Sequence, residues 1–439
     1  MRNRILLFTA LLLCLFAMAC GTSSSADDAA ESESAAASSD ENSGDAASAG
    51  SADAPEITGS MALSYAEQFT IDYCADGCTL ITIGGADEYL IVPEDTAVPS
   101  YASEMTVIMQ PLSDIYLASS AVMDLFVELG SLDAVSFTST DQESWSIEEA
   151  AEAIGNGTLT YVGKYSAPDY ETLLEAGCAL AVENTMIYHQ PEVKEQLENL
   201  GISVLVDLSS YESHPLGRTE WIRLYGTLLG LDEEADALFA EKEALFESVL
   251  SAVEADHGAS DSAADADTGT DTAAEDAAAD TGTDTAAEDD TLTVAYFYMT
   301  AAGAANIRKP GDYITKLIEY AGGTYVFTAA DLDLDEEEDN ALSTMNLQFE
   351  AFYAQAKDAD VLIYNSSISG ALYTMDDLID LNSLFSDFAA VQAGHVWCTE
   401  KDMFQQTGAA ADILEEFYEI FNGTAPEEMQ FFHRLQGSE

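Results

Sequence analysis

The sequence has 439 residues, 48% of them hydrophobic, so it is long enough for two domains with substantial cores. Its formal net charge at pH 7 is −68, from 81 acidic and 13 basic residues. A field of this sign repels the phosphates of nucleic acids and of anionic lipids, so we expect no nucleic-acid partner. Because cations are scarce, each lysine or arginine of the folded part is worth locating.

The N-terminus has the features of an export signal. Arg2 and Arg4 precede an apolar run over residues 5–18, too short for a transmembrane helix. Small residues then lead to Cys20 in an order that resembles the bacterial lipobox, which implies cleavage before Cys20 and lipid attachment to its thiol. We expect a signal peptide over 1–20, a disordered acidic tether over 21–59, and a membrane-anchored, extracytoplasmic protein. Ordinary secretion with an accidental Cys20 is the alternative.

The remaining cysteines fit that compartment. Cys74 and Cys78 flank an Ala-Asp-Gly turn between two β-rich runs, and they form either a hairpin-closing disulfide or two reduced thiols. Cys178 and Cys398 lie in apolar, strand-like runs, so we expect both to be buried.

The first half of the chain predicts an α/β lobe over 60–230. A β-meander is expected over 64–98, and an apolar stripe predicts a helix over 121–129. Strands and helices then alternate to about residue 208, which indicates a mainly parallel sheet covered by helices. The stretch 161–186 reads as strand, loop, short helix ended by Gly177, and strand, closing in polar residues at the carboxyl edge where such folds bind ligands.

The middle of the chain predicts a connection between two lobes. A helix is expected over 219–229, with Gly230 as its stop, and a long inter-lobe helix over 231–253. Residues 254–290 contain DTGTDTAAED twice and no aromatic residue, which predicts a disordered acidic insertion. A second α/β lobe is expected over 291–439, with helices over 312–321, 347–357 and 409–421.

Five stretches resemble one protein family. GKYSAPDYETLL, AVENTMIYH, SSYESHPLGRTEWI, NIRKPGDYITKLIEYAGG and ALSTMN resemble substrate-binding lipoproteins of ABC importers, of the ferric-siderophore and vitamin B12 class. The resemblance covers roughly 60–253 and 291–436. It implies two α/β lobes joined by a single long rigid helix, a ligand cleft between them, a monomer, and delivery of an iron complex to a permease and its ATPase.

The resemblance also implies two docking residues. In this family a glutamate near the start of a helix in each lobe binds arginines of the permease. The matching positions are Glu171, before the strand-like run 179–182, and Glu350, before the run 360–363. Ala179 stands where the family usually has a proline-aspartate pair. The competing interpretation is that each is one of many surface acids.

We expect the scarce cations to bind an anionic chelate, with aromatic and polar side chains beside them. Tyr313 and Phe404 are further aromatic candidates. The expected ligand-binding residues are Ser119, Lys164, Tyr165, Asn184, Tyr211, Arg218, Trp221, Arg308, Lys309, Asn346, Ser366 and Lys401. The alternative for Arg218 and Lys309 is a structural ion pair with a nearby acid.

Other functions remain open. His189 and His214, with Glu183, Glu212 or Tyr188, would be the ligands of a bare Zn, Mn or Fe site. Haem and cobalamin are alternative ligands, and no resident cofactor is expected. The sequence contains no Gly-x-Ser-x-Gly, P-loop or His-Glu-x-x-His motif, so an extracytoplasmic hydrolase is the weakest alternative and we expect no enzyme.

Overall fold

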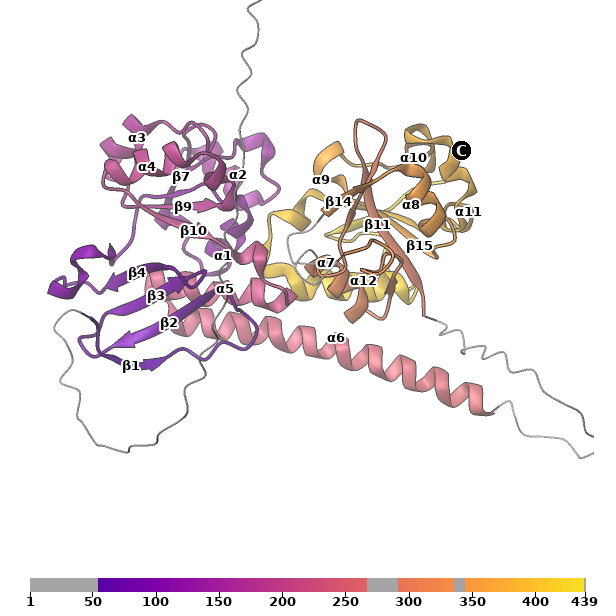
Figure 1. Ribbon diagram of the computed structural model, residues 1–439, viewed down its shortest axis with the longest axis horizontal. Coiled ribbons are helices and arrows are strands. Elements are labelled where there is room, and N and C mark those ends of the chain that lie inside the picture. The colour runs from indigo at the N-terminus through magenta and orange to yellow at the C-terminus, as the bar shows by residue number, and fades with distance from the viewer. Residues whose placement is uncertain (1–53, 267–290, 335–343, 438–439) are drawn as a thin grey trace, which may run out of the picture. The chain divides into compact units, whose positions relative to one another are not determined.

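The computed structural model describes residues 54–266, 291–334 and 344–437 (Figure 1). Its first sheet has the strand order β1-β2-β3-β4-β5, and only the β4–β5 pair is parallel. The expected meander is therefore confirmed. β1 begins at Ile57, inside the segment 21–59 that is expected to be a tether, and it pairs with β2. The strands are β1 (Ile57–Ser60), β2 (Phe69–Cys74), β3 (Thr79–Ile83), β4 (Asp87–Val92) and β5 (Thr106–Met109).

The second sheet is wholly parallel, with the order β10-β9-β6-β7-β8. Its two faces are covered by different helices, as a parallel sheet requires. Leu180 and Val182 of β9 face a core shared with α1, α2 and α5, whereas Ala181 faces a core built with α3 and α4. The elements are β6 (Ile115–Leu117), β7 (Val135–Thr138), β8 (Thr160–Tyr161), β9 (Leu180–Asn184), β10 (Ser203–Asp207), α1 (Met123–Glu128), α2 (Glu148–Asn156), α3 (Tyr170–Ala176) and α4 (Pro191–Asn199).

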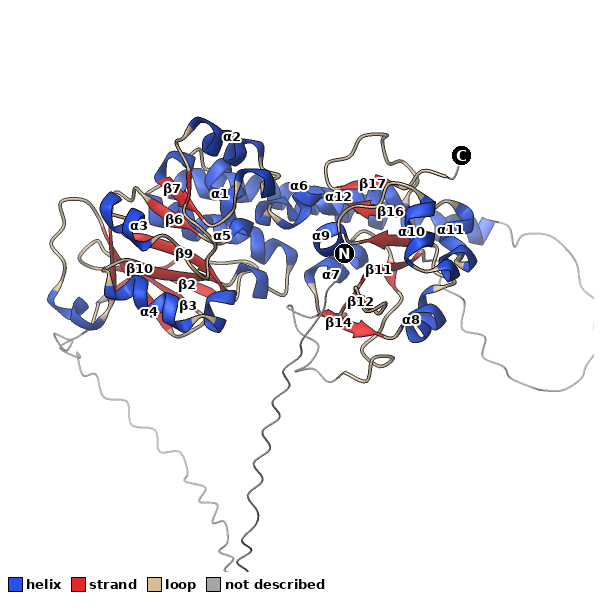
Figure 2. Cartoon of the chain, turned by 90° about the horizontal axis from the view of Figure 1, so that it is seen from above, coloured by secondary structure: helices blue, strands red, loops and turns tan. Residues whose placement is uncertain are grey.

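The third sheet forms the C-terminal lobe, with the order β14-β12-β11-β15-β16-β17 and β13 beside β11 (Figure 2). Its centre is parallel, but β12, β14 and β17 pair antiparallel. The elements are β11 (Thr293–Met299), β12 (Ala305–Arg308), α7 (Tyr313–Tyr320), β13 (Thr324–Tyr325), β14 (Thr344–Leu347), α8 (Phe349–Ala356), β15 (Val361–Tyr364), α9 (Ser366–Ser369), α10 (Met375–Leu381), α11 (Ala389–Ala393), β16 (Val396–Thr399), α12 (Ala410–Phe421) and β17 (Phe432–Arg434).

Two consecutive helices follow the second sheet. α5 (Pro215–Leu229) ends at Gly230, whose φ of 72° is the left-handed stop that the sequence predicts. α6 (Asp232–Ala266) contacts both α5 and α12. The helix does not end at residue 253 as expected but continues to Ala266, into the segment predicted to be a disordered insertion. Gly226 lets α5 and α6 approach, since a Cβ there would lie 2.4 Å from the Cβ of Ala235.

The cysteines of the described residues are free thiols. Cys74 and Cys78 are both buried and unbonded, which is the reduced form of the two alternatives. Burial raises the pKa of Cys78 to about 11, so its thiol is unreactive. Cys178 and Cys398 are buried as expected. Cys20 lies outside the described residues, within which no helix is long and apolar enough to cross a membrane.

Candidate functional site

Two scarce arginines meet around Tyr313, although they are far apart in the sequence. Arg218, in the first turn of α5, places its guanidinium carbon 4.0 Å from the centre of the Tyr313 ring. Arg308, at the end of β12, donates from Nη1 to Oδ2 of Asp312 over 3.1 Å. Burial raises the pKa of Asp312, and both guanidinium groups oppose that rise. Arg218 and Arg308 therefore share one electrostatic environment.

Arg308 combines a structural ion pair with aromatic contacts. Its guanidinium carbon lies 6.0 Å from the ring centre of Tyr296 and 5.9 Å from that of Phe404. Burial alone would lower its pKa, but Asp312 reverses the shift and the pKa rises. Its Nε is buried, with no hydrogen-bond partner among the described residues. Arg308 thus stabilises the end of β12 and keeps one donor unmatched.

Arg218 is less completely paired than Arg308. It is 8% exposed, and no ion pair or hydrogen bond from its guanidinium is seen within the described ranges. The nearby carboxylate of Asp207 is already engaged, because it accepts hydrogen bonds from the hydroxyls of Ser209 and Tyr225. A guanidinium carries five N–H donors in a planar fork that matches an oxyanion. This arrangement suits binding of a carboxylate or a comparable anionic group.

Exposed apolar side chains occur beyond the carboxyl ends of the parallel strands in both lobes. Tyr188, which follows β9, is 52% exposed, and Tyr211, which follows β10, is 37% exposed. Ile368, which follows β15, is 69% exposed. Ligands of α/β folds bind at these strand ends. The strand ends therefore offer apolar surface as well as charge.

The small polar residues expected to contact a ligand mostly bind their own backbone or neighbours. The side chain of Asn184 accepts from the backbone N–H of Met186, and Ser366 bonds Oγ1 of Thr399. Asn346 accepts from the side-chain amide of Asn306. Ser119 is 2% exposed. The structure places Asn184 at the end of β9, and Ser119 and Ser366 just after the ends of β6 and β15. Local hydrogen bonds engage the side chains of Asn184 and Ser366.

One expected ligand residue belongs to the core. Trp221 is fully buried in the N-terminal lobe, and its Nε1 donates to Glu212 over 2.8 Å. It has no surface to offer a ligand, so that expectation is wrong. Its apolar ring lies on the inward face of α5, which the polar sequence around it had obscured. Lys164 and Tyr165, in the loop after β8, and Lys401, after β16, retain exposed surface, and Lys309 is half-buried.

The histidine alternative finds no metal site. Nδ1 of His214 accepts from the backbone N–H of Leu216, and its ring stacks on Tyr65 at 4.6 Å, so it caps α5. His189 is exposed. Nowhere in the described ranges do three or more His, Cys, Asp or Glu side chains gather as a metal site requires. His214 is a structural residue rather than a metal ligand.

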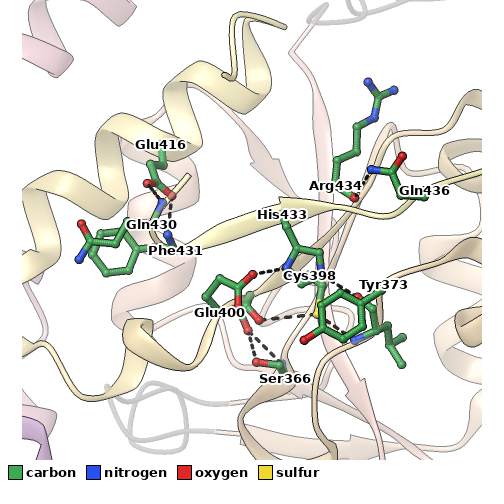
Figure 3. A network of polar contacts seen from close by, with 12 residues as sticks. Ser366, Tyr373, Cys398, Glu400, Glu416, Gln430, Phe431, His433, Arg434 and Gln436 are labelled. Carbon is green, nitrogen blue, oxygen red and sulfur yellow. Dashed lines mark hydrogen bonds and ion pairs between the residues drawn. The ribbon is translucent and has the colours of Figure 1, made fainter. Parts of the chain in front are cut away.

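A second polar network lies at the edge of the C-terminal sheet (Figure 3). His433 of β17 contacts the Glu400 carboxylate through Nδ1 and the Leu372 carbonyl through Nε2. Its ring stacks on Tyr373 at 5.0 Å. Both ring nitrogens are occupied, so the network ties β17 to the loop before α10. It is separate from the cluster around Tyr313.

Sequence reasoning missed two members of the arginine cluster. Tyr296 lies within an apolar strand, where nothing in the sequence distinguishes it from a core residue. Asp312 had a detectable signal, because it caps α7 and stands four residues after Arg308. An acid at that spacing from a scarce cation is a candidate partner.

The two expected docking residues occupy equivalent positions in the two lobes. Glu171 is the second residue of α3, and the chain then enters β9. Glu350 is the second residue of α8, and the chain then enters β15. Both are exposed. The positions match those that the resemblance implies.

Comparisons with known proteins place this geometry in a fold. No family model matches the sequence. The chain is 23% identical over 336 residues to an uncharacterized lipoprotein of Methanocaldococcus jannaschii, covering 72% of this chain and 68% of that protein.

Two solved structures share its fold at low sequence identity. A periplasmic haem-binding protein from Pseudomonas aeruginosa has a TM-score of 0.53 at 14% identity, over 74% of this chain and 98% of its own. A periplasmic binding protein from Veillonella parvula has a TM-score of 0.52 at 14% identity, over 72% and 94%. The chain therefore has the two-lobed α/β fold of the periplasmic binding proteins.

Proposed function

We propose that this protein is an extracytoplasmic substrate-binding lipoprotein that captures an anionic iron complex and delivers it to an ABC permease and its ATPase. The observation that carries the proposal is the Arg218 guanidinium, which has unmatched donors and lies against Tyr313 in a binding-protein fold. In a chain of net charge −68, a cation that forms no ion pair within the described residues is a specific attractor for an anion. The lipoprotein relative supports the membrane anchor through Cys20.

The ligand class follows from the chemistry of the site. Arginine donors suit carboxylates or catecholates, and exposed tyrosines and Ile368 suit a ligand with a large apolar face. A siderophore-type ferric chelate has both properties. Haem has them too, and one structural neighbour is a haem-binding protein. Cobalamin and a bare metal ion are less well matched, the latter because the described residues offer no metal-ligand cluster.

The test is thermal melting of residues 21–439 with a panel of ligands. The panel contains ferric catecholate and hydroxamate siderophores, haemin, cobalamin, and free Zn²⁺, Mn²⁺ and Fe³⁺. A ligand that binds only the folded state raises the melting temperature by mass action. We expect one iron complex to do so, while a shift with free metal alone, or with nothing, would contradict the proposal. Turnover of a bound compound would favour the hydrolase alternative.

Arg218→Gln tests the binding role directly. The variant keeps a polar side chain but loses the charge, so we expect at least about tenfold weaker binding of the panel ligand, the value of a hydrogen bond to a charged group. Lys194→Gln on α4 is the matched control, because its ammonium pairs with Glu198 on the helix surface. Unchanged affinity in Arg218→Gln, measured by titration, would remove Arg218 from the site.

Glu171 and Glu350 are proposed to dock on the permease. Removing both with Glu171→Ala and Glu350→Ala should abolish ligand uptake by cells and leave ligand affinity unchanged. The control pair is Glu175→Ala with Glu319→Ala, which changes the net charge equally at two other exposed helix positions. Normal uptake in the first double variant would contradict the docking role.

A further inference from the structure

The segment that follows β16 carries direct contacts to the N-terminal lobe. It comprises two short 3-10 helices, Lys401–Phe404 and Thr407–Ala409, and the start of α12. Between the two helices lies Gln405. Its Oε1 accepts from the backbone N–H of Ser146 over 2.8 Å and from the Ser146 hydroxyl over 2.7 Å. Its Nε2 donates to the Ser144 carbonyl over 2.8 Å. One amide side chain thus makes three hydrogen bonds to one loop.

Both sides of this contact are firmly anchored. On the N-terminal side, Trp145 and Ile147 are buried in the core on either side of Ser146. On the C-terminal side, Met403 is 2% exposed and belongs to the other core. Because neither backbone can move freely, the Gln405 hydrogen bonds report on the separation of the two lobes.

Further contacts on the same segment reinforce the connection. The backbone N–H of Gly408 donates to Oδ2 of Asp124 in α1 over 2.7 Å. Nζ of Lys242 lies 3.1 Å from Glu128 and 3.0 Å from Asp412, and so joins α1 to α12. Gln405 is half-buried, as are Lys242, Glu128 and Asp412. The hydrogen bonds of Gln405 join neutral groups, whereas the contacts of Lys242 join charged groups, so the Gln405 hydrogen bonds are the more readily broken.

The residue before Gln405 belongs to the arginine cluster. The Phe404 ring centre lies 5.9 Å from the guanidinium carbon of Arg308. A ligand anion that binds Arg308 or Arg218 would press on or pull this ring, and the next residue along the chain is the one bonded to Ser146. The backbone offers no flexible spacer between the two.

We infer that Gln405 is a positioning residue that links ligand binding at the arginine cluster to the contact between the lobes. The inference rests on the proposed binding function. Bound ligand holds Phe404, Phe404 fixes Gln405, and the Gln405 amide keeps the Ser144–Ser146 loop against the C-terminal lobe. Loss of the Gln405 amide leaves the ligand contacts in place but lets the lobes separate sooner. This loss therefore accelerates ligand release more than it slows ligand capture.

The experiment compares Gln405→Ala, Gln405→Glu and Gln406→Ala in residues 21–439. Gln406 is the matched control, because its side chain accepts from Gln430 within the C-terminal lobe. Hydrogen exchange at the Ser146 amide is measured first, without ligand. Dissociation of haemin, and of a ferric catecholate, is then followed by stopped flow.

We expect the Ser146 amide to be protected in the wild-type protein and in Gln406→Ala, and to exchange faster in Gln405→Ala. Loss of the three neutral hydrogen bonds predicts dissociation faster by roughly a hundredfold, with little change in the association rate. Gln405→Glu keeps the acceptor for Ser146 but loses the donor to Ser144. Its dissociation rate should therefore lie between those of the wild-type protein and Gln405→Ala.

Two results would overturn the inference. An unprotected Ser146 amide in the wild-type protein would remove the contact, whatever the ligand. Wild-type dissociation from Gln405→Ala would remove the link to binding. If no iron complex of the panel binds the wild-type protein, the proposed iron-complex function fails instead, and the exchange result still decides the contact.

Discussion

Two sites in the N-terminal lobe bury glutamates completely, and they treat the charge in opposite ways. Glu212 and Glu220, at α5, accept hydrogen bonds from the backbone amides of five consecutive residues, 64–68. Trp221 and Arg223 add donors to the same carboxylates. Glu183, in β9, is equally inaccessible, yet neither of its oxygens has a partner among the described residues.

The difference shows that burial alone does not decide whether a carboxylate stabilises or destabilises the fold. Burial raises the pKa of Glu212, but the amides of Glu67 and Gln68 and the Trp221 indole oppose the shift. At Glu183 nothing opposes it, and burial raises the pKa to about 8. A buried charge with enough donors fastens a chain segment, whereas one without donors destabilises the fold.

The largest expected change in stability comes from removing the carboxylate of Glu220, which is fully hydrogen-bonded. Glu220→Gln leaves the amides of Ser64, Tyr65 and Ala66 facing an amide that also presents its own N–H groups. We expect a loss of about 3 kcal/mol in the free energy of unfolding, typical of a broken buried charge network. Denaturant unfolding at pH 7 measures it, with Glu233→Gln on the exposed start of α6 as the control. A loss below about 0.5 kcal/mol, the range of an ordinary surface change, would contradict this account.

Replacing Glu183, which has no hydrogen-bond partner among the described residues, should raise the free energy of unfolding instead of lowering it. The folded pKa of Glu183, about 8, lies above the ordinary value of 4.5, so ionisation is easier in the unfolded chain. Stability therefore falls as pH rises from 4.5 to 8. Glu183→Gln removes that dependence and should gain about 2 kcal/mol at pH 7, allowing for the unpaired amide it introduces.

The control for this second prediction is internal. Below pH 4.5 Glu183 is neutral in both states, so only the cost of the introduced amide remains and the variant should be no more stable than the wild-type protein. Denaturant unfolding from about pH 4 to pH 8.5 provides the comparison. A variant that is equally destabilised at every pH would mean that Glu183 has an unrecognised partner.

The smallest expected effect sharpens the comparison at a single donor. Trp221→Phe keeps an aromatic ring in the core but removes the Nε1 donor to Glu212. We expect a loss of about 1–2 kcal/mol, combining one hydrogen bond with a modest volume change. In the double variant with Glu212→Gln, the total loss of stability should be smaller than the sum of the two single-variant losses, because both changes affect one hydrogen bond. Strict additivity would show that the indole and the carboxylate act independently.

Much of the fold could be predicted because it depends on local pattern. The meander, the stop of α3 at Gly177 and the stop of α5 at Gly230 all follow from alternation or from one left-handed glycine. The predicted end of α6 at residue 253 was wrong, because the acidic, aromatic-free composition that follows it predicts disorder, whereas the helix continues to Ala266. The ligand-binding role predicted for Trp221 was wrong, because the helix expected over 219–229 did not reveal which of its faces packs into the core.

Local sequence patterns were enough to predict the two α/β lobes and the equivalent helix positions of Glu171 and Glu350. Composition showed the scarcity of cations that makes Arg218 and Arg308 notable. The packing of distant segments places Phe404 beside Arg308 and Gln405 against Ser146. It also gives Glu220 its donors, while Glu183 has none among the described residues. The reason is physical. Periodicity and capping act between neighbours in the chain, but a polar side chain is satisfied by whichever distant backbone the packing of the faces brings to it.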